Sequence, residues 1–206
     1  ASDNGYCVAG GKSVKGEYTY VKDGSFVRFP TTYNAVNLLD PKKGTIEFQV
    51  SLTIPPTGFT ENRVFFNNLV QGGTGCGTST GPCYKGYEIF LNTNGILKGI
   101  AKNVDVSGAT PVQLTEEVNY TESQIWQTGQ YYRVIFTWGS FQEGPKIKIY
   151  VDDTTDAKDD KIVDANFLNS MGVNNNFYIG SNQAGKFQAR AVIDDIKIWN
   201  FTKSKS

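Results

Sequence analysis

Apolar and polar side chains alternate one by one along most of this chain. In GTIEFQVSL, residues 44–52, Ile46, Phe48, Val50 and Leu52 fall on every second position. A period of two with one apolar face is typical of half-buried antiparallel strands. The same period recurs in further segments, separated by clusters of Gly, Asn, Asp or Pro, at 18–21, 26–29, 62–71, 86–92, 96–103, 130–138, 145–153, 176–180 and 190–200. The pattern predicts an all-β fold, a two-sheet antiparallel β-sandwich of the jelly-roll type.

Two stretches of the chain do not alternate. Residues 153–175 are expected to form a long loop with one helical turn at 165–169. Residues 1–12 are rich in glycine and are expected to form an N-terminal arm, which leaves 13–206 as a single jelly-roll domain. Such an arm can add a strand to the sheet edge of a neighbouring molecule.

The composition narrows the range of functions. Lys and Arg together number 20, as do Asp and Glu, so the formal net charge is zero. Neither a nucleic-acid surface nor a polybasic membrane anchor is therefore expected, and the chain has no long apolar run for membrane insertion. The absence of histidine excludes histidine-based acid–base catalysis and histidine metal sites. The 13 Phe, 11 Tyr and 3 Trp can fill a core and leave aromatic side chains for a surface.

Two of the three cysteines lie in one glycine-rich segment, GGTGCGTSTGPCYKGY. Cys76 and Cys83 are seven positions apart, and a disulfide between them is expected. A disulfide indicates an oxidising compartment and hence a secreted or cell-surface protein. Cys7 is left over: it is free, or pairs with Cys76 or Cys83 instead, or cross-links to another chain. The segment is either a staple on a long connection or a loop that presents a binding site.

Nearly the whole chain, roughly residues 13–203, resembles a known family, and the C-terminal part does so most specifically. TGQYYRVIFTW, EGPKIKIYVDD and NFYIGSNQAGKFQARAVIDDIKIWN follow one another as in the laminin-G-like, concanavalin A-like lectin/glucanase superfamily. DGSFVRFP and GTIEFQV look like its early strands, whereas Gln49 stands where many members carry Trp. The resemblance implies a jelly-roll sandwich, frequent carbohydrate binding and often a structural calcium. The fold also hosts glycosidases, lyases and structural modules, so it does not by itself define a function.

Catalysis is not expected. The glycosidases of the resembling superfamily carry Glu-x-Asp-x-(x-)Glu on one strand, which places paired carboxylates on one face. Here the positions two and four after Glu47 hold Gln49 and Ser51. The lyases of the superfamily use histidine, which this chain lacks. We therefore predict a protein that is not an enzyme.

One acidic residue stands among core-facing positions of the last strand. In AVIDDIKIW, Asp194 shares the parity of Val192, Ile196 and Ile198, where a carboxylate is costly unless it is paired or bound to a metal. Calcium prefers oxygen ligands, and the resembling family often places a calcium near this strand. We predict Asp194 as a calcium ligand with Asp23 as its companion. The alternative is that Asp194 accepts backbone N–H groups at a strand end.

Sugars stack on exposed aromatic rings and form hydrogen bonds with amide and guanidinium groups. Tyr84 and Tyr87 flank the end of the glycine-rich segment, and Asn68 and Arg63 lie on the strand that leads into that segment. Trp126 precedes a later strand in a polar context. We predict that these five residues form the rim of a glycan-binding site. The function predicted first is a lectin-like or adhesion domain that binds a glycan or polysaccharide.

A structural function is the alternative. A compact sandwich without net charge, carrying an arm with Cys7, would also suit a subunit of a surface layer or extracellular filament. Such a subunit would assemble through residues 1–12 and would need no sugar site.

Overall fold

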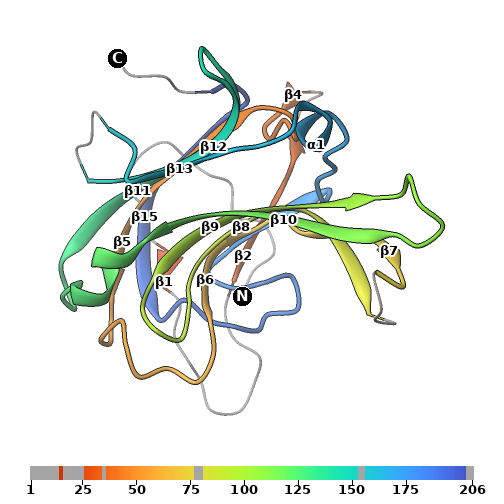
Figure 1. The fold of residues 1–206 in the computed structure, drawn as a ribbon. Helices are drawn as coiled ribbons and strands as arrows, with labels where there is room; N and C mark the ends of the chain where they lie inside the picture. The colour runs from red at the N-terminus through yellow and green to blue at the C-terminus, as the bar shows by residue number, and fades with distance from the viewer. Residues whose placement is uncertain (1–13, 16–25, 34–35, 77–80, 153–155, 203–206) are drawn as a thin grey trace.

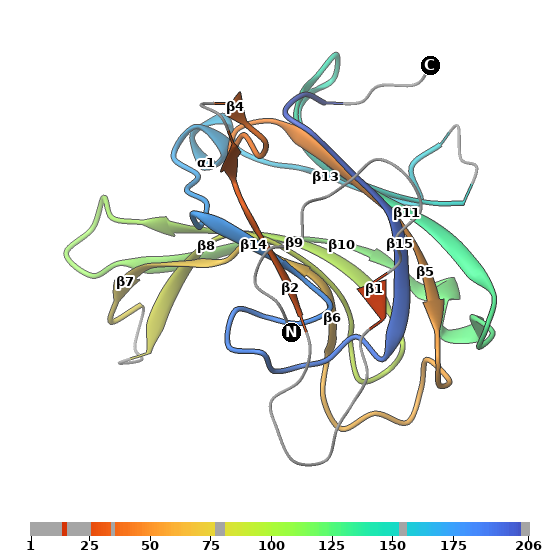
Figure 2. The same ribbon diagram turned by 180° about the vertical axis from the view of Figure 1, so that it is seen from behind.

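Two antiparallel β-sheets pack face to face in the computed structural model of the protein (Figure 1; Figure 2). The structure describes residues 14–15, 26–33, 36–76, 81–152 and 156–202. The predicted arm at 1–12, the predicted strand at 18–21, Cys7 and Asp23 lie outside these residues. Assembly through the arm therefore stays a prediction.

Each sheet combines consecutive antiparallel strands with strands from distant parts of the chain, as in a jelly roll. Sheet A has the order β1 (Val14–Lys15), β15 (Ala191–Trp199), β5 (Gly44–Leu52), β11 (Tyr131–Phe141), β12 (Gly144–Val151) and β13 (Asp159–Ile162). Sheet B has the order β10 (Val112–Tyr120), β9 (Leu97–Asp105), β8 (Pro82–Leu91), β6 (Arg63–Asn67), β14 (Asn176–Ile179) and β2 (Val27–Pro30), and β7 (Val70–Thr74) pairs with β8. The remaining elements are the pair β3 (Thr32–Tyr33) and β4 (Val36–Asn37), a 3-10 turn (Thr121–Ile125) and α1 (Ala165–Asn169). The predicted all-β sandwich is confirmed.

The core lies between the sheets and is built from the alternating apolar positions. In sheet A, Ile46 of β5 pairs with Phe136 of β11, and Phe48 pairs with Val134. All four are fully buried. Because the two strands present their apolar residues in register, they form one continuous face for sheet B to cover.

The predicted helical turn is confirmed, since α1 spans Ala165–Asn169 and its first turn is capped by the Asp164 carboxylate. The prediction of a loop over 153–175 is wrong at Asp159–Ile162, which forms β13 against β12. The sequence pattern also missed β10, Val112–Tyr120, along which only Val118 is buried. Both are edge strands, where most side chains meet water and an apolar period is not needed.

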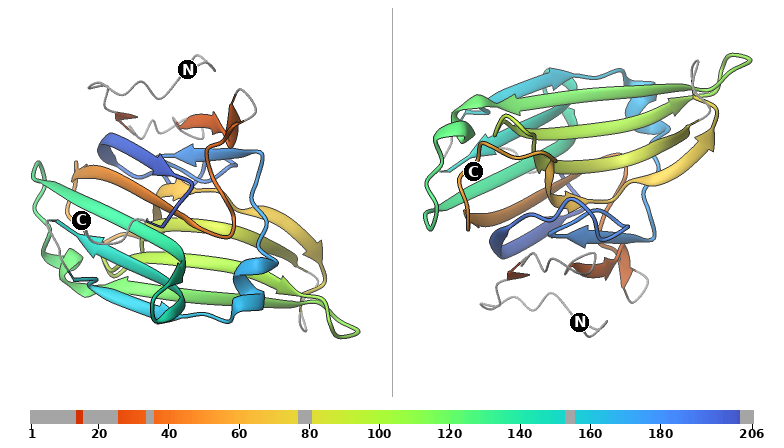
Figure 3. Two further views of the ribbon diagram at one scale, coloured as in Figure 1. Left: turned by 90° about the horizontal axis from the view of Figure 1, so that it is seen from above. Right: turned by 90° about the horizontal axis from the view of Figure 1, so that it is seen from below.

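Strands β10 and β13 lie beside each other at one margin of the sandwich (Figure 3). The backbone N–H of Asn119 in β10 donates to the Asp159 carboxylate of β13 at 2.7 Å. The Lys161 ammonium of β13 lies 4.0 Å from the Glu116 carboxylate of β10. Side chains therefore join the sheets at this margin.

Candidate functional site

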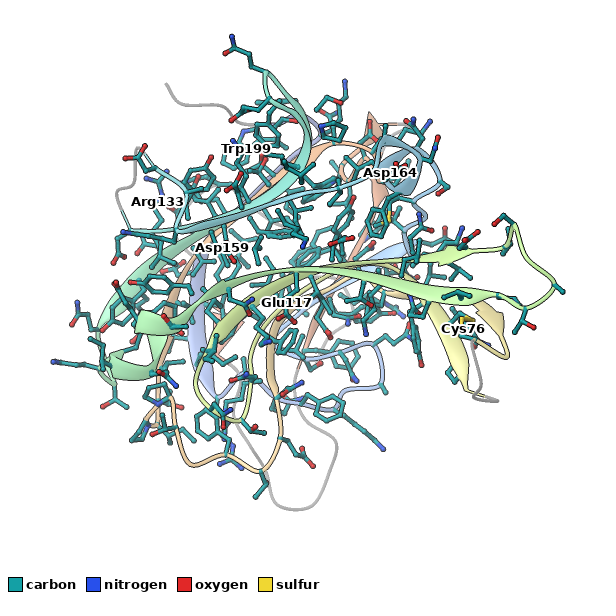
Figure 4. All side chains as sticks on the ribbon, in the orientation of Figure 1. Cys76, Glu117, Arg133, Asp159, Asp164 and Trp199 are labelled. Atoms are coloured by element: carbon teal, nitrogen blue, oxygen red, sulfur yellow. A yellow bond between two sulfur atoms is a disulfide. The ribbon has the colours of Figure 1, made fainter. Side chains whose placement is uncertain are left out.

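The predicted disulfide between Cys76 and Cys83 is present, with a Cα–Cα distance of 5.6 Å (Figure 4). Cys83 is fully buried, and the two cysteines pack with Val104 of β9 in a small cluster apart from the main core. The bond joins the segment after β7 to the start of β8. This arrangement supports the staple interpretation of the glycine-rich segment.

Tyr84 lies on the outer face of sheet B, close to the disulfide. Its backbone is held by the Gln113 side chain, whose Oε1 accepts from the Tyr84 N–H at 2.6 Å and whose Nε2 donates to the Tyr84 carbonyl at 2.9 Å. The Lys102 ammonium lies 5.8 Å from the centre of the half-buried Tyr84 ring. Tyr84 therefore keeps a partly accessible ring, and its part in binding stays a prediction.

Two other aromatic residues of the predicted rim are core residues. Tyr87 is fully buried, stacks on Trp138 at 4.2 Å between ring centres and donates its hydroxyl to the Pro41 carbonyl. Trp126 is 5% exposed and stacks on Tyr132 with ring centres 4.4 Å apart. The surface placement predicted for Tyr87 and Trp126 is wrong, because both rings fill gaps between the sheets.

Asn68 is also buried, and its role is to hold a loop. Its amide Nδ2 donates to the carbonyls of Asn174 and Asn176 at 3.3 and 3.0 Å. Arg63 and Tyr84 lie far apart on sheet B. Arg63 pairs with Leu91 at one end of β8, seven positions from Tyr84. Seven residues of extended strand span roughly 23 Å. The structure thus does not bring the five predicted residues together into one rim.

Arg63 is the first residue of β6 and directly follows the loop 53–62. This loop and the loop 181–190 lie at one end of the sandwich, on the lower side in Figure 1. The Arg63 side chain is 7% exposed, and the guanidinium carbon lies 3.4 Å from the centre of the Phe59 ring. Burial first and the charge of Arg190 second lower the pKa of Arg63 to about 10, while the Glu61 carboxylate acts in the opposite direction. The Arg63 Nε has no hydrogen-bond partner within the described part of the chain.

The loop 181–190 holds two strained residues beside Arg63. Phe187 and Arg190 have φ angles of 59° and 46°, in the left-handed region that favours glycine. Three hydrogen bonds fix them: Val64 N–H to the Phe187 carbonyl at 2.9 Å, and Thr53 N–H and Oγ1 to the Arg190 carbonyl at 3.0 and 2.7 Å. Left-handed residues other than glycine persist only where neighbouring structure holds them, and they concentrate at functional sites.

The same loop presents a ring and a buried amide. The Phe187 ring is 38% exposed. Gln188 is 9% exposed and donates its Nε2 to the Gly185 carbonyl, while its Oε1 has no partner among the residues that the structure describes. We call Phe59, Arg63, Phe187, Gln188 and Arg190 the loop end. The sequence offered one signal for it: Phe187, Gln188 and Arg190 follow closely after an Asn-Gln-Ala-Gly turn at 182–185.

The described residues do not form a calcium site around Asp194. Its carboxylate accepts the backbone N–H of Asp195 at 2.8 Å, as in the alternative considered from the sequence. Asp195 in turn pairs with Lys197. No group of three or more Cys, Asp or Glu side chains converges within the described ranges, and Asp23 lies outside them. Calcium binding stays a prediction, and unchanged thermal stability in a chelator would contradict it.

Glu47, the only acidic residue of β5, is used in an ion-pair cluster. Arg133 donates to its carboxylate from Nε and Nη2, both at 3.0 Å, and the Lys197 ammonium lies 3.6 Å away. Since the Glu47 side chain is 5% exposed, the two cations compensate a carboxylate that would otherwise be costly to bury. This arrangement explains a buried acid without a catalytic role.

The fold and the arrangement of its strands define a lectin-like β-sandwich. A family model described as the concanavalin A-like lectin/glucanases superfamily, of the laminin G type, matches residues 29–206, and the chain belongs to this superfamily. A search of curated proteins finds no significant match. No helix among the described residues is long and apolar enough to cross a membrane.

Solved structures with the same fold include binding domains of botulinum neurotoxins. The binding domain of serotype D is similar with a TM-score of 0.58 and 12% identity, over 89% of this chain and 39% of that one. The binding domain of neurotoxin DC in complex with SialylT has a TM-score of 0.56 and 13% identity, over 92% and 39%. A structure of type C, whose cell entry depends on two ganglioside molecules, has a TM-score of 0.56 and 12% identity, also over 92% and 39%. The chain thus spans well under half of these domains, and at such identities the likeness shows the fold alone.

Proposed function

We propose that this chain is a non-catalytic carbohydrate-binding domain and that it binds sugar at the loop end. The superfamily and the binding domains with the same fold support the class of function. The observation that carries the location is Phe187, whose ring is exposed and whose backbone is held in a left-handed conformation, directly before the buried Gln188. A partly exposed aromatic ring on a strained, hydrogen-bonded backbone adds little to the core, which favours a role in binding.

The groups at the loop end match the chemistry of a sugar ring. A pyranose presents C–H groups on one face, which pack on an aromatic ring, and hydroxyls at its rim, which both donate and accept. Phe187 supplies the ring, Arg63 Nε is a donor and Gln188 Oε1 is an acceptor, each without a partner among the described residues. The chemistry of these groups favours a ligand that both donates and accepts hydrogen bonds.

The disulfide and the superfamily support a setting outside the cytosol. A Cys76–Cys83 bond persists in oxidising compartments. We therefore place the domain on a cell surface or in a secreted protein, where glycan binding would serve attachment.

Glycan-array screening followed by calorimetry with the best ligand tests the proposal. Phe187→Ala removes the stacking surface and should weaken binding about tenfold or more. Phe201→Ala is the matched control, since Phe201 is an exposed ring in the segment after β15, near Trp199 at the end of that strand away from the loop end. Equal affinity of the Phe187→Ala variant and the unaltered protein would remove the loop end as the sugar site.

A further inference from the structure

The hairpin that joins β9 to β10 extends beyond the core of the sandwich (Figure 1; Figure 3). Exposure increases along one face of β10 toward this hairpin: Val118 is fully buried, Leu114 is 37% exposed and Val112 is 45% exposed. Of these three residues, only Val118 belongs to the core. Val106, at the start of the turn, is 67% exposed. We call Val106, Val112 and Leu114, with the turn residues 107–111, the hairpin tip. Its apolar side chains contribute little to folding, so their presence requires another reason.

The hairpin tip and its surroundings lack charge. No residue from Val106 to Thr115 is charged. Strand β7 and the disulfide lie at the same end of the sandwich, and no residue from 64 to 84 is charged either (Figure 1; Figure 2). Apolar side chains that project from the fold without any neighbouring charge are suited to an environment that excludes both water and ions.

Charged and amphipathic side chains begin at the base of the tip. Asp105 pairs with Val112 across the hairpin, and its carboxylate accepts the N–H of Ser107 at 2.8 Å. On the outer face of sheet B, the Lys102 ammonium lies 5.8 Å from the centre of the half-buried Tyr84 ring. An apolar end followed by a tyrosine and by charges of both signs matches the order of layers in a zwitterionic bilayer. There the hydrocarbon gives way to a headgroup zone in which Tyr and Lys are favoured.

The tip is held in place without a ligand. Strand β10 pairs with β9 over its whole length, up to the turn itself. The Gln113 side chain then joins the hairpin to β8, because its Nε2 donates to the carbonyls of Tyr84 and Asn103 at 2.9 and 2.7 Å. Its Oε1 accepts the N–H of Tyr84. Since the hairpin is already ordered, little conformational entropy is lost when it meets a partner.

We propose that the hairpin tip inserts shallowly into the interface of a phospholipid bilayer and so gives the domain a peripheral contact with a membrane. A lipid partner fits this surface better than a protein does. Interfaces between proteins involve about 20–30 residues a side with a polar rim, whereas the tip is a projecting, uncharged end. A bilayer accommodates such an end, and each apolar group that leaves water stabilises the contact.

This contact is separate from the proposed sugar site. Arg63 of the loop end pairs with Leu91 at one end of β8, whereas Tyr84 at the base of the tip lies near the other end of that strand. The membrane contact therefore leaves the loop end directed away from the bilayer. It also requires no polybasic segment and no membrane-spanning helix.

Co-sedimentation with phosphatidylcholine vesicles that contain no glycolipid tests the inference. We expect the protein to bind at millimolar lipid, with an affinity that NaCl changes little. Val106→Ser and Val112→Ser each remove two methyl groups from an exposed side chain and should weaken binding by roughly five- to tenfold. Ile125→Ser is the matched control, because Ile125 is 79% exposed on the 3-10 turn that follows the far end of β10. It should leave binding within about twofold, as should Phe187→Ala at the loop end.

Val106→Trp provides a second readout that reports on the tip itself. Relative to the unaltered protein, the fluorescence of this variant should gain a component that shifts to shorter wavelength when vesicles are added. A variant that co-sediments with vesicles but shows no such shift would mean that another surface binds the lipid, and would overturn the inference.

Other outcomes also overturn it. These are an unaltered protein that does not sediment with vesicles, a Val106→Ser variant that binds as well as the unaltered protein, and binding that disappears at high NaCl, which indicates attraction by charge alone. Self-association that Val106→Ser abolishes, without vesicle binding, would mean that a second copy of the chain covers the tip instead. None of these results affects the proposed sugar site, because the vesicles carry no glycan.

Discussion

Replacing Phe187 by alanine and by glycine separates the stability of the loop end from its binding. Both variants lose the ring, and both should lose glycan binding to the same extent. They differ in backbone freedom, because the φ of 59° at this position disfavours any residue with a Cβ. We therefore expect the glycine variant to be the more stable of the two, contrary to the usual order in regular structure.

The size of the difference follows from the structure. About three-fifths of the ring is covered, since it is 38% exposed, so each variant should lose roughly 3 kcal/mol of burial. A left-handed backbone conformation at a residue with a Cβ lowers the free energy of unfolding by about 1–2 kcal/mol. Glycine avoids this strain, but its greater freedom in the unfolded state lowers the stability of the glycine variant by roughly 0.5–1 kcal/mol. Glycine should therefore exceed alanine by about 0.5–1 kcal/mol, or by roughly 0.3–0.5 M in the urea midpoint.

Equilibrium unfolding in urea measures this order, with calorimetry on the same samples for binding. Phe201, exposed by 49% and outside the left-handed residues of the described chain, is the matched position. There alanine should be the more stable replacement. A Phe187→Gly variant that is less stable than Phe187→Ala would show that the left-handed conformation stores no strain. A variant that keeps its glycan affinity would show that the ring does not bind sugar.

Three further predictions concern the rest of the molecule. Replacing Cys76 and Cys83 together by serine should cost about 2–3 kcal/mol, because the bond closes a loop of seven positions, and a reductant should then shift the urea midpoint of the unaltered protein but not of the variant. Burial raises the pKa of Glu88, so the folded state binds the proton of the Glu88 carboxyl more tightly than the unfolded state does. The stability that this proton contributes is therefore lost as the pH rises from the ordinary pKa of Glu through the raised pKa of the folded state. Glu88→Gln should therefore raise Tm at pH 7 and change little near about pH 3, where the carboxyl is protonated in both states; an equal gain at both values would refute the role of ionisation. Trp126→Ala should cost about 3–5 kcal/mol, as expected for removal of a buried ring that stacks on Tyr132, and a thermal unfolding curve unchanged from that of the unaltered protein would contradict the core placement.

The parts of the fold that could be predicted are those with one face in the core. Strand β5 spans Gly44–Leu52, the bounds that alternation indicates, because a strand between two others must bury every second side chain. Strand β10 could not be predicted in this way. As an edge strand it buries only Val118 from Val112 to Tyr120, so its sequence carries little period.

The site was harder to predict because it depends on contacts between loops. Tyr84 and Tyr87 are three positions apart on one strand, and alternation alone places them on opposite faces, as the structure does. Trp126 follows a polar segment but is buried by a stacking partner, Tyr132, that no local pattern reveals. Of the predicted residues, Arg63 belongs to the loop end, and its neighbour Phe187 comes from a segment more than a hundred positions away. Such pairings follow from the topology rather than from the local sequence.

The bond from the Asn119 N–H to Asp159 has a consequence for solubility. The outer edge of a sheet offers a row of backbone donors and acceptors that can template a strand from another molecule, and natural proteins protect such edges. Here a carboxylate of sheet A occupies a backbone donor at the edge of sheet B, and the Lys161–Glu116 pair adds charge along the same margin. The contacts between the two edge strands thus protect this margin against edge-to-edge aggregation. Any polymer built by strand addition has to start from another margin of the sandwich.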